Sequence, residues 1–455
     1  MAEPATDPPS AHSFLTGWTL KILIIGLIIR LVLAPLLTYP FDVEHWAVIL
    51  QNMESSNALF GLTGYFYTPV WGYILGTINT LIESFCGLDL FGIRFTDLLG
   101  IEALNHIYYT ATTTTPLFNL AMKLPLILCD VLVGYLIWQL IIEKTDDQKK
   151  ATAGFSLWFL CPLVIYMSGI QVQFDCISAL MALLSVILLK KDHYFLAGIM
   201  FALGTLIKLF PAFLVLLFVI YLLRVHKNDG QAFRKIGWAA LGTVLTVGII
   251  FLPQILDGTL SNAFSFITDR ASETSEITNR LVTYFFAAVG LVIMTYVAWR
   301  MNKLDAHQAR DKLYKYALAT LAGTGLIAIG PQYCIVFLPL LIYYATAEDR
   351  GYRLCVYIIG IGGLGAALAN NSVSLLTSAG EFWGLWSAAD ILSWMQAFET
   401  EIGGVTVAAW TIALFTVMES FGILLVSCFL WAELPHTGRF LRLQKLILQL
   451  KKLQP

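Results

Sequence analysis

The sequence predicts an all-α polytopic membrane protein, on the basis of its composition, its long apolar runs and the uneven placement of its basic residues. Of 455 residues, 58% are hydrophobic and only 13% are charged, whereas soluble domains carry about 25% charged residues. The mean hydropathy is +0.74. An aromatic content of 13% excludes a disordered chain, and a net charge of −2 leaves no basic field for nucleic acid.

The apolar runs are long enough to cross a bilayer about twelve times, because one crossing needs roughly 20 apolar residues. The stretch 193–224 has room for two crossings, and Lys208 with Pro211 marks the expected break. The run that carries Arg30 is too long for a signal-peptide core, so we expect it to be retained as the first span. The predicted crossings lie near residues 18–38, 117–142, 152–169, 174–189, 193–208, 209–224, 235–253, 281–300, 313–329, 331–347, 352–369 and 406–432.

The basic residues predict the orientation of the chain. With the N-terminus in the cytoplasm, 21 of the 28 basic residues fall in loops or tails on the cytoplasmic side. Such a bias is the positive-inside rule, and it supports an even number of spans with both termini cytoplasmic. We therefore divide the chain into an unstructured cytoplasmic N-terminus (1–17), a transmembrane domain (18–432) and a basic amphipathic tail (433–455), which either lies on the headgroups or acts as a solubilising tail.

The longest outer segment is 39–115, directly after the first span. Within it the apolar run 65–85 starts around Pro69 and ends before Cys86 and Gly87. Counting this run as a span would move Lys144 to the outside, so we expect an interfacial or partly re-entrant helix. A large structured outer loop favours a functional site at the outer interface of the membrane.

Two carboxylates follow the first span in the string FDVEHW at 41–46. Asp42 and Glu44 are two residues apart, so in an extended segment they share one face and present a carboxylate pair to a ligand. His45 and Trp46 follow directly. The alternative is an interfacial loop with solvated acids and a tryptophan anchor.

Few cations remain on the outer side to meet an anionic ligand. Lys208 is the most suggestive, because it interrupts an apolar run beside a proline; its alternative is a helix-capping or snorkelling lysine. The outer candidates are Arg94, Lys123, Lys208, Arg270 and Arg280.

Polar residues also stand at two other outer junctions. Gln171, Gln173 and Asp175 share one face if their turn is extended, and Gln332 with Tyr333 occupies a similar junction. These groups are suited to hydrogen-bonding a sugar or, alternatively, to capping helix ends.

Three further features favour structural roles. Arg30 and Asp130 are predicted to form a buried pair. Gly360, Gly362 and Gly365 match G-x-G-x-x-G inside an apolar span, where close helix packing is the expected use. The seven scattered cysteines and seven histidines form no metal-ligand or disulfide pattern, so neither a metal nor a cofactor is predicted.

Several motifs, in order, resemble the GT-C superfamily of glycosyltransferases. The string Asp42-Val-Glu44-His45-Trp46 is similar to the acidic motif of the dolichyl-phosphate-glucose-dependent glucosyltransferases. Tyr67-Thr68-Pro69 and the run at 122–138 are more similar to the GPI mannosyltransferase branch, and 161–180, 197–214 and 331–343 resemble both. The resemblance covers about residues 18–350. It implies a GT-C fold and an inverting transfer of mannose or glucose from a polyprenyl-phosphate carrier to a hydroxyl of a glycan or lipid-linked acceptor, at the non-cytoplasmic face.

The resemblance also implies roles for the candidate residues. Asp42 would be the general base, since a phosphate leaving group needs cations rather than a general acid, and Glu44 would assist it. No cofactor is implied, because the lipid-phosphate sugar is itself the donor. Substrate contacts would come from His45, Tyr67, Gln173, Asp175, Gln332 and Tyr333, and phosphate contacts from Lys208 with Arg94, Lys123, Arg270 and Arg280.

Two other classes of protein stay open. A secondary transporter usually shows internal repeats and binds at the bilayer midplane on broken helices, as the Lys208–Pro211 break allows. A lipid flippase is the second alternative. The sequon Asn370-Asn371-Ser372 lies on the outer side, but an ER membrane and a bacterial or archaeal plasma membrane remain equally open.

Overall fold

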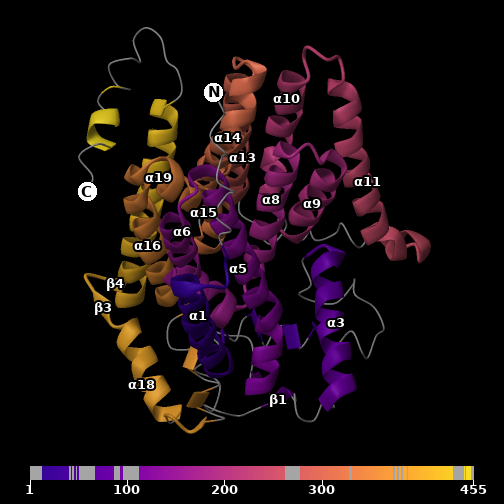
Figure 1. Ribbon diagram of the computed structural model, residues 1–455. Coiled ribbons are helices and arrows are strands. Elements are labelled where there is room, and N and C mark those ends of the chain that lie inside the picture. The colour runs from indigo at the N-terminus through magenta and orange to yellow at the C-terminus, as the bar shows by residue number, and fades with distance from the viewer. Residues whose placement is uncertain are drawn as a thin grey trace.

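The structure is a computed structural model, and it is described for most of the chain. The described ranges are 13–39, 67–86, 93–95, 112–261, 277–326, 330–371 and 388–433, with shorter pieces within 42–50 and 375–386, residue 445 and residues 447–451. Within these ranges the chain is mostly helical, and the long helices run side by side as a bundle (Figure 1).

The first half of the bundle is built from helices that begin at prolines or after short turns. α5 (Pro116–Thr145) starts at a proline, where the missing N–H costs nothing, and Thr115 caps it by accepting from the Phe118 N–H. The elements in chain order are α1 (Gly17–Leu36), α3 (Pro69–Cys86), α5, α6 (Gln148–Phe159), α7 (Pro162–Tyr166), the π-helix η1 (Met167–Gln171), α8 (Asp175–Lys190), α9 (Tyr194–Ile207), the 3-10 helix η2 (Phe210–Leu214) and α10 (Val215–Val225).

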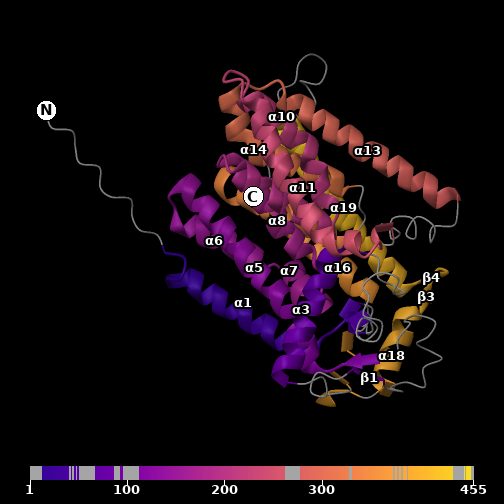
Figure 2. The ribbon, with the colours of Figure 1, turned by 90° about the vertical axis from the view of Figure 1, so that its right-hand side faces the viewer.

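The second half packs around the same core. α13 runs along the outside of the bundle in Figure 2. The remaining helices are α11 (Ala232–Leu256), α13 (Ile277–Met301), α14 (Ala306–Gly325), α15 (Pro331–Tyr343), η3 (Tyr344–Glu348), η4 (Arg350–Tyr352), α16 (Arg353–Asn371), α18 (Ala388–Glu399) and α19 (Val407–Glu433).

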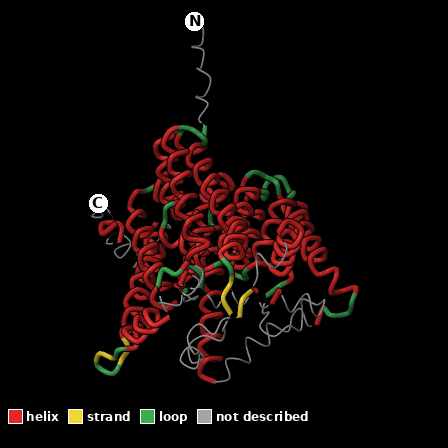
Figure 3. The backbone as a smooth tube through the Cα atoms, turned by 90° about the horizontal axis from the view of Figure 1, so that it is seen from below, coloured by secondary structure: helices red, strands yellow, loops and turns green. Residues whose placement is uncertain are grey.

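Two short antiparallel ribbons interrupt the all-α prediction. β1 (Ile93–Phe95) pairs with β2 (Thr112–Thr114), and β3 (Glu401–Ile402) pairs with β4 (Val405–Thr406). Both ribbons lie at the lower end of the bundle in Figure 1, and Figure 3 views them from below. The first ribbon joins two parts of the predicted outer loop 39–115, which is therefore partly structured.

The described helices include five that are long and apolar enough to cross a membrane, or six if the bent pair α6 and α7–η1 counts as one span. The twelve predicted crossings are thus not shown. Several of the predicted spans are short helices: α8 has 16 residues, α9 has 14 and α10 has 11. A hydropathy window measures the apolar length of such a stretch without seeing where the helix breaks.

The predicted break near Lys208 is confirmed. α9 ends at Ile207, Lys208 has an extended backbone, and the 3-10 helix η2 with Pro211 follows. The apolar run 65–85 also contains a helix that starts at Pro69. Tyr73 of this helix donates to the Ile250 carbonyl of α11, so α3 packs against the bundle.

The glycine pattern of α16 serves helix packing, as predicted. A Cβ at Gly362 would lie 2.7 Å from the backbone N of Glu419, and one at Gly365 would lie 2.2 Å from the ring of Phe415. Both neighbours belong to α19, so the glycines let the two helices approach closely.

The basic loops meet at one end of the bundle, which we call the basic end. Ion pairs join Lys144 to Glu348 at 3.1 Å and Lys191 to Glu143 at 2.7 Å. Further pairs join Arg310 to Asp192 at 2.8 Å and Lys451 to Asp349 at 2.7 Å. Near the N-terminus, Gln148 donates to the Ser13 carbonyl. The loops predicted to share one side of the membrane, and both described ends of the chain, therefore share one end of the fold.

Candidate active site

The candidate site lies at the end of the bundle opposite the basic end. α8 runs from Asp175 to Lys190, and its last turn reaches the basic end. Sixteen helical residues rise about 24 Å, which separates Asp175 from the basic loops. α9 returns the chain to Lys208 at the same end as Asp175.

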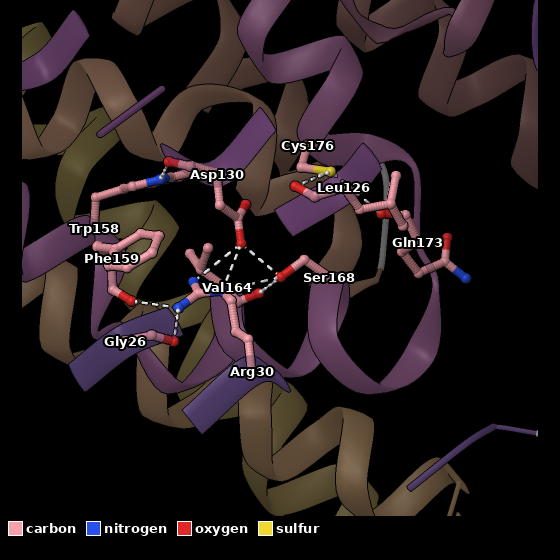
Figure 4. Close-up of polar contacts among 10 residues, drawn as sticks. All are labelled: Gly26, Arg30, Leu126, Asp130, Trp158, Phe159, Val164, Ser168, Gln173 and Cys176. Carbon is pink, nitrogen blue, oxygen red and sulfur yellow. Dashed lines mark hydrogen bonds and ion pairs between the residues drawn. The ribbon is translucent and has the colours of Figure 1, made fainter. Parts of the chain in front are cut away.

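A buried network anchors α1 against the elements that form the site (Figure 4). The Arg30 guanidinium lies 3.0 Å from Asp130 of α5, and its Nη1 donates to the Phe159 carbonyl at 2.8 Å. Ser168 of η1 also donates to Asp130. Arg30, Asp130 and Ser168 are fully buried. The predicted pair of Arg30 and Asp130 is confirmed, and it ties α1, α5 and η1 together just before Gln173.

Lys123 closes the end of α1 from which the acidic motif leaves. Its Nζ donates to the carbonyls of Ala34 and Leu37, both at 2.6 Å, and to the Thr38 hydroxyl at 3.2 Å. These three contacts use all three ammonium protons, and the side chain is fully buried. The structure therefore corrects the phosphate-binding assignment of Lys123: its role here is to cap α1.

Asp42 is half-buried beyond this cap and is held by an amide. Gln173 Nε2 donates to Asp42 Oδ2 at 2.7 Å. Burial raises the pKa of Asp42 to about 7, while the hydrogen bond from Gln173 and the charge of Lys208 act in the opposite direction. A carboxyl with a pKa near neutrality is suited to take a proton from a hydroxyl.

The turn that delivers Gln173 is not the extended segment that was expected. η1 is a π-helix that ends at Gln171, Val172 has a left-handed backbone (φ 62°), and Asp175 already opens α8. A β-branched residue is strained in that region, and such strain tends to occur at functional turns. The turn, rather than β alternation, directs Gln173 toward Asp42.

Asp175 and Lys208 form an ion pair beside Asp42. Lys208 Nζ lies 3.2 Å from Asp175 Oδ2, where the carboxylate is fully buried and the lysine is 14% exposed. The same ammonium lies 4.9 Å from the ring centre of Phe174 and 5.6 Å from that of Tyr333. Lys208 is thus a fixed cation with its charge partly open to a ligand.

Aromatic rings form one wall of the site. Phe174 stacks on Trp71 at 4.5 Å and meets Tyr67 edge-on at 5.0 Å, and Trp46 lies 5.5 Å from Tyr67. Beside this wall, the Thr68 hydroxyl donates to the carbonyl of Leu206, two residues before Lys208. The rings place α3 and the acidic motif against the start of α8.

The structure brings together six of the predicted site residues and leaves others aside. Gln332 lies in the first turn of α15, next to Tyr333 in the chain. Glu44, His45 and Arg270 lie outside the described residues, and for Arg94 and Arg280 only the backbone is described. The residues that gather are Asp42, Tyr67, Gln173, Asp175, Lys208 and Tyr333.

Sequence reasoning missed two rings of the aromatic wall: Phe174, which lies 4.9 Å from the Lys208 ammonium, and Trp71, which stacks on Phe174. The signal for Phe174 was its place between Gln173 and Asp175; Trp71 carried none, because an aromatic residue early in an apolar helix usually packs in a core. As for metals, no group of three or more His, Cys, Asp or Glu side chains in the described part of the chain is placed to hold an ion.

The fold defines a class of protein: a mostly helical membrane protein with five or six candidate spans among its described helices. Residues 116–328, slightly less than half of the chain, match the family model of Glycosyltransferase family 87. The match includes Gln173, Asp175 and Lys208, whereas Asp42 precedes it. The resemblance to polyprenyl-phosphate-sugar glycosyltransferases is thereby confirmed.

One curated relative is GPI mannosyltransferase 1 of Saccharomyces cerevisiae. The chain is 25% identical to it over 131 residues, which make up 28% of this chain and 32% of the relative. The matched part therefore spans about a third of the length of that protein.

Proposed function

We propose that the protein is an inverting glycosyltransferase that moves mannose or glucose from a polyprenyl-phosphate carrier to an acceptor hydroxyl, on a lipid-linked glycan, at the non-cytoplasmic face. The observation that carries this proposal is the placement of Asp42 and Lys208 in one cluster. The cluster combines a carboxylate able to accept a proton with a cation able to hold a phosphate, on a chain with a family 87 region.

The proposed reaction is a single displacement. The acceptor oxygen forms a bond to the anomeric carbon while its proton passes to Asp42, and the bond from that carbon to the phosphate oxygen breaks. The phosphate leaves with the electron pair, and Lys208 stabilises its charge. Because the phosphate is a weak base, no residue needs to protonate it, and one displacement inverts the anomeric centre.

The neighbouring residues support these two groups. Gln173 orients the Asp42 carboxylate, and Asp175 fixes Lys208. Tyr67, Tyr333 and Gln332 are proposed to contact the sugar, and Glu44 and His45 to assist the base. The remaining cations Arg94, Arg270 and Arg280 are proposed to join Lys208 on the phosphate.

The proposed topology places the basic end in the cytoplasm, with both termini there and the site on the other side. α8, α9, α10 and α15 would complete about twelve crossings as short or broken spans. α3 and the helices that flank Lys208 would receive the prenyl chain. The membrane is either the ER or a bacterial or archaeal plasma membrane.

The test uses the purified full chain with radiolabelled polyprenyl-phosphate mannose and glucose and a set of glycan acceptors. Transfer is expected from one donor, and Asp42→Asn should lower its rate by about 10²- to 10⁴-fold. Asp257→Asn is the matched control. This exposed aspartate follows α11 and accepts a hydrogen bond from the Thr259 N–H, so the variant should transfer the sugar at the wild-type rate. Equal rates in both variants would refute the role of Asp42. Uptake of sugar lipid into liposomes without transfer would instead favour the transporter or flippase.

A further inference from the structure

A second site, separate from the cluster around Asp42, is an apolar cavity between α13, α14 and α19. Its volume is about 510 Å³. Its walls include Val292 and Tyr296 of α13, Ala319 and Gly323 of α14, and Trp431 of α19. Ile447 of the C-terminal segment also lines it. Among the side chains that line it, only Ser427, Cys428 and the polar atoms of the two aromatic residues interrupt the hydrocarbon surface.

The cavity opens toward the outside of the bundle. Val292 lines it and is nevertheless 67% exposed, and the adjacent Leu291 is 61% exposed. On the other wall, α19 is one of the candidate spans and exposes Leu424 and Phe421. These exposed apolar faces are suited to contact bilayer hydrocarbon, which would give lipid chains access to the cavity. A cavity lined in this way does not attract water, which needs several polar partners.

A tryptophan and two cations lie in the last turn of α13 and directly after it, beside the cavity. Arg300 is four residues after Tyr296, so it lies on the same helix face as that wall of the cavity. Arg300 and Lys303 lie 5.6 Å and 5.1 Å from the ring centre of Trp299. Neither cation forms an ion pair with an acidic side chain in the described ranges.

This arrangement matches the parts of an anionic lipid. Tryptophan and basic side chains are typical of the headgroup level of a bilayer. Arg300 belongs to the basic end, and anionic lipids attract basic segments at the cytoplasmic leaflet. The hydrocarbon walls are complementary to an acyl chain. The two cations, which have no acidic partner among the described side chains, are complementary to the phosphate of the lipid.

We propose that this cavity binds one hydrocarbon chain of an anionic membrane phospholipid, with the lipid phosphate at Arg300 and Lys303. The lipid sits between α13 and α19 and fills a gap that the two helices leave open. The site lies toward the basic end and is therefore distinct from the donor site proposed at Lys208.

The test measures lipid carried by the purified full chain. The protein is incubated with phosphatidylglycerol or phosphatidylcholine in mild detergent, and bound lipid is counted by native mass spectrometry. Wild-type protein should retain about one phosphatidylglycerol. Ala319→Phe, which fills the cavity, should reduce the retained lipid at least fivefold. The matched control Ala413→Phe lies on the exposed face of α19, outside the cavity, and should retain lipid as the wild type does.

A second pair of measurements separates the cavity from the headgroup contacts. Arg300→Gln with Lys303→Gln should abolish the preference for phosphatidylglycerol over phosphatidylcholine. If Ala319→Phe does not yield folded protein, Ser427→Leu blocks the cavity from α19 instead. Equal retention in cavity-filled and control variants would overturn the proposal. So would the recovery of polyprenyl phosphate instead of phospholipid, or a dimer that dissociates when the cavity is filled.

Discussion

The Asp42 carboxylate accepts a hydrogen bond from a neutral amide, and this partner affects its pKa. The hydrogen bond from Gln173 favours the carboxylate, while burial favours the protonated acid, and burial has the larger effect. A direct ion pair with Lys208 would have lowered the pKa of Asp42 and weakened it as a base. The structure instead assigns the direct ion pair of Lys208 to Asp175.

The pH dependence of transfer should follow the Asp42 carboxylate. Its pKa is raised to about 7, so the base form is scarce below neutrality and dominates above it. The transfer rate should therefore rise with pH and reach half its maximum near pH 7. Gln173→Leu removes a hydrogen bond that lowers this pKa, so the rising limb should move to higher pH. A rising limb that keeps its position in Gln173→Leu would contradict the assignment.

Variants of the Lys208–Asp175 ion pair should separate its contribution to stability from the contribution of Lys208 to transfer. Lys208→Met leaves a buried, uncompensated carboxylate, which should lower the free energy of unfolding by about 3 kcal/mol. Adding Asp175→Asn to this variant should restore most of the stability, because the buried charge is gone. Thermal unfolding in detergent measures this recovery. Transfer should stay strongly reduced in the double variant, since the Lys208 ammonium no longer stabilises the phosphate; recovered transfer would refute the role of Lys208.

Single helices in this fold are placed by contacts at their ends and by close approach along their length. Lys123 closes α1, and Arg30 links α1 to α5 through Asp130. α16 and α19 touch where Gly362 leaves room for the α19 backbone. Each of these contacts joins segments that are distant in sequence.

Two glycine substitutions should have opposite effects on stability. A Cβ at Gly362 meets the rigid backbone of α19 at 2.7 Å, so Gly362→Ala should lower the melting temperature. Gly248 in α11 has no atom within 4 Å of an added Cβ, so Gly248→Ala should stabilise its helix by about 0.5–1 kcal/mol. Thermal unfolding of the two variants in the same detergent tests this contrast. A Gly362→Ala variant as stable as Gly248→Ala would argue against close packing of α16 and α19.

The bundle as a whole has two chemically different ends. The basic end gathers loops that are far apart in sequence, and the other end carries Asp42, Asp175, Lys208 and the two strand ribbons. This polarity is what the positive-inside rule predicts for a protein with both termini in the cytoplasm.

Labelling from each side of the membrane should reveal this polarity. Lys149→Cys and Asp257→Cys place thiols on exposed sites at the basic end and beyond α11, respectively. In sealed vesicles of known orientation, an impermeant maleimide should label position 149 only from the cytoplasmic side and position 257 only from the opposite side. The buried native cysteines at 161, 176, 334 and 355 should react little. Labelling of both positions from one side would refute the proposed topology.

Much of the candidate site was predictable because its residues are chemically out of place in an apolar chain. A carboxylate after the first span and a lysine inside an apolar run are costly there, so Asp42 and Lys208 stand out from composition alone. The same reasoning selected Lys123 as a phosphate ligand, whereas its contacts show that it caps α1. Its capping contacts with Ala34 and Leu37 join α5 to α1, and no local sequence pattern predicts contacts between residues so far apart in the chain.

The amino-acid sequence alone determines the membrane character, the helical class and the shared side of the basic loops. These properties depend on hydropathy and charge averaged over neighbouring residues, so they can be predicted without knowledge of the tertiary structure. The tertiary structure alone decides which polar groups contact one another, because these contacts depend on how each helix is rotated and where it breaks. The left-handed Val172 turns Gln173 toward Asp42, and the end of α9 at Ile207 brings Lys208 to Asp175. Both contacts arise only once the helices pack, since only packing holds an unfavourable backbone angle or a buried charge in place.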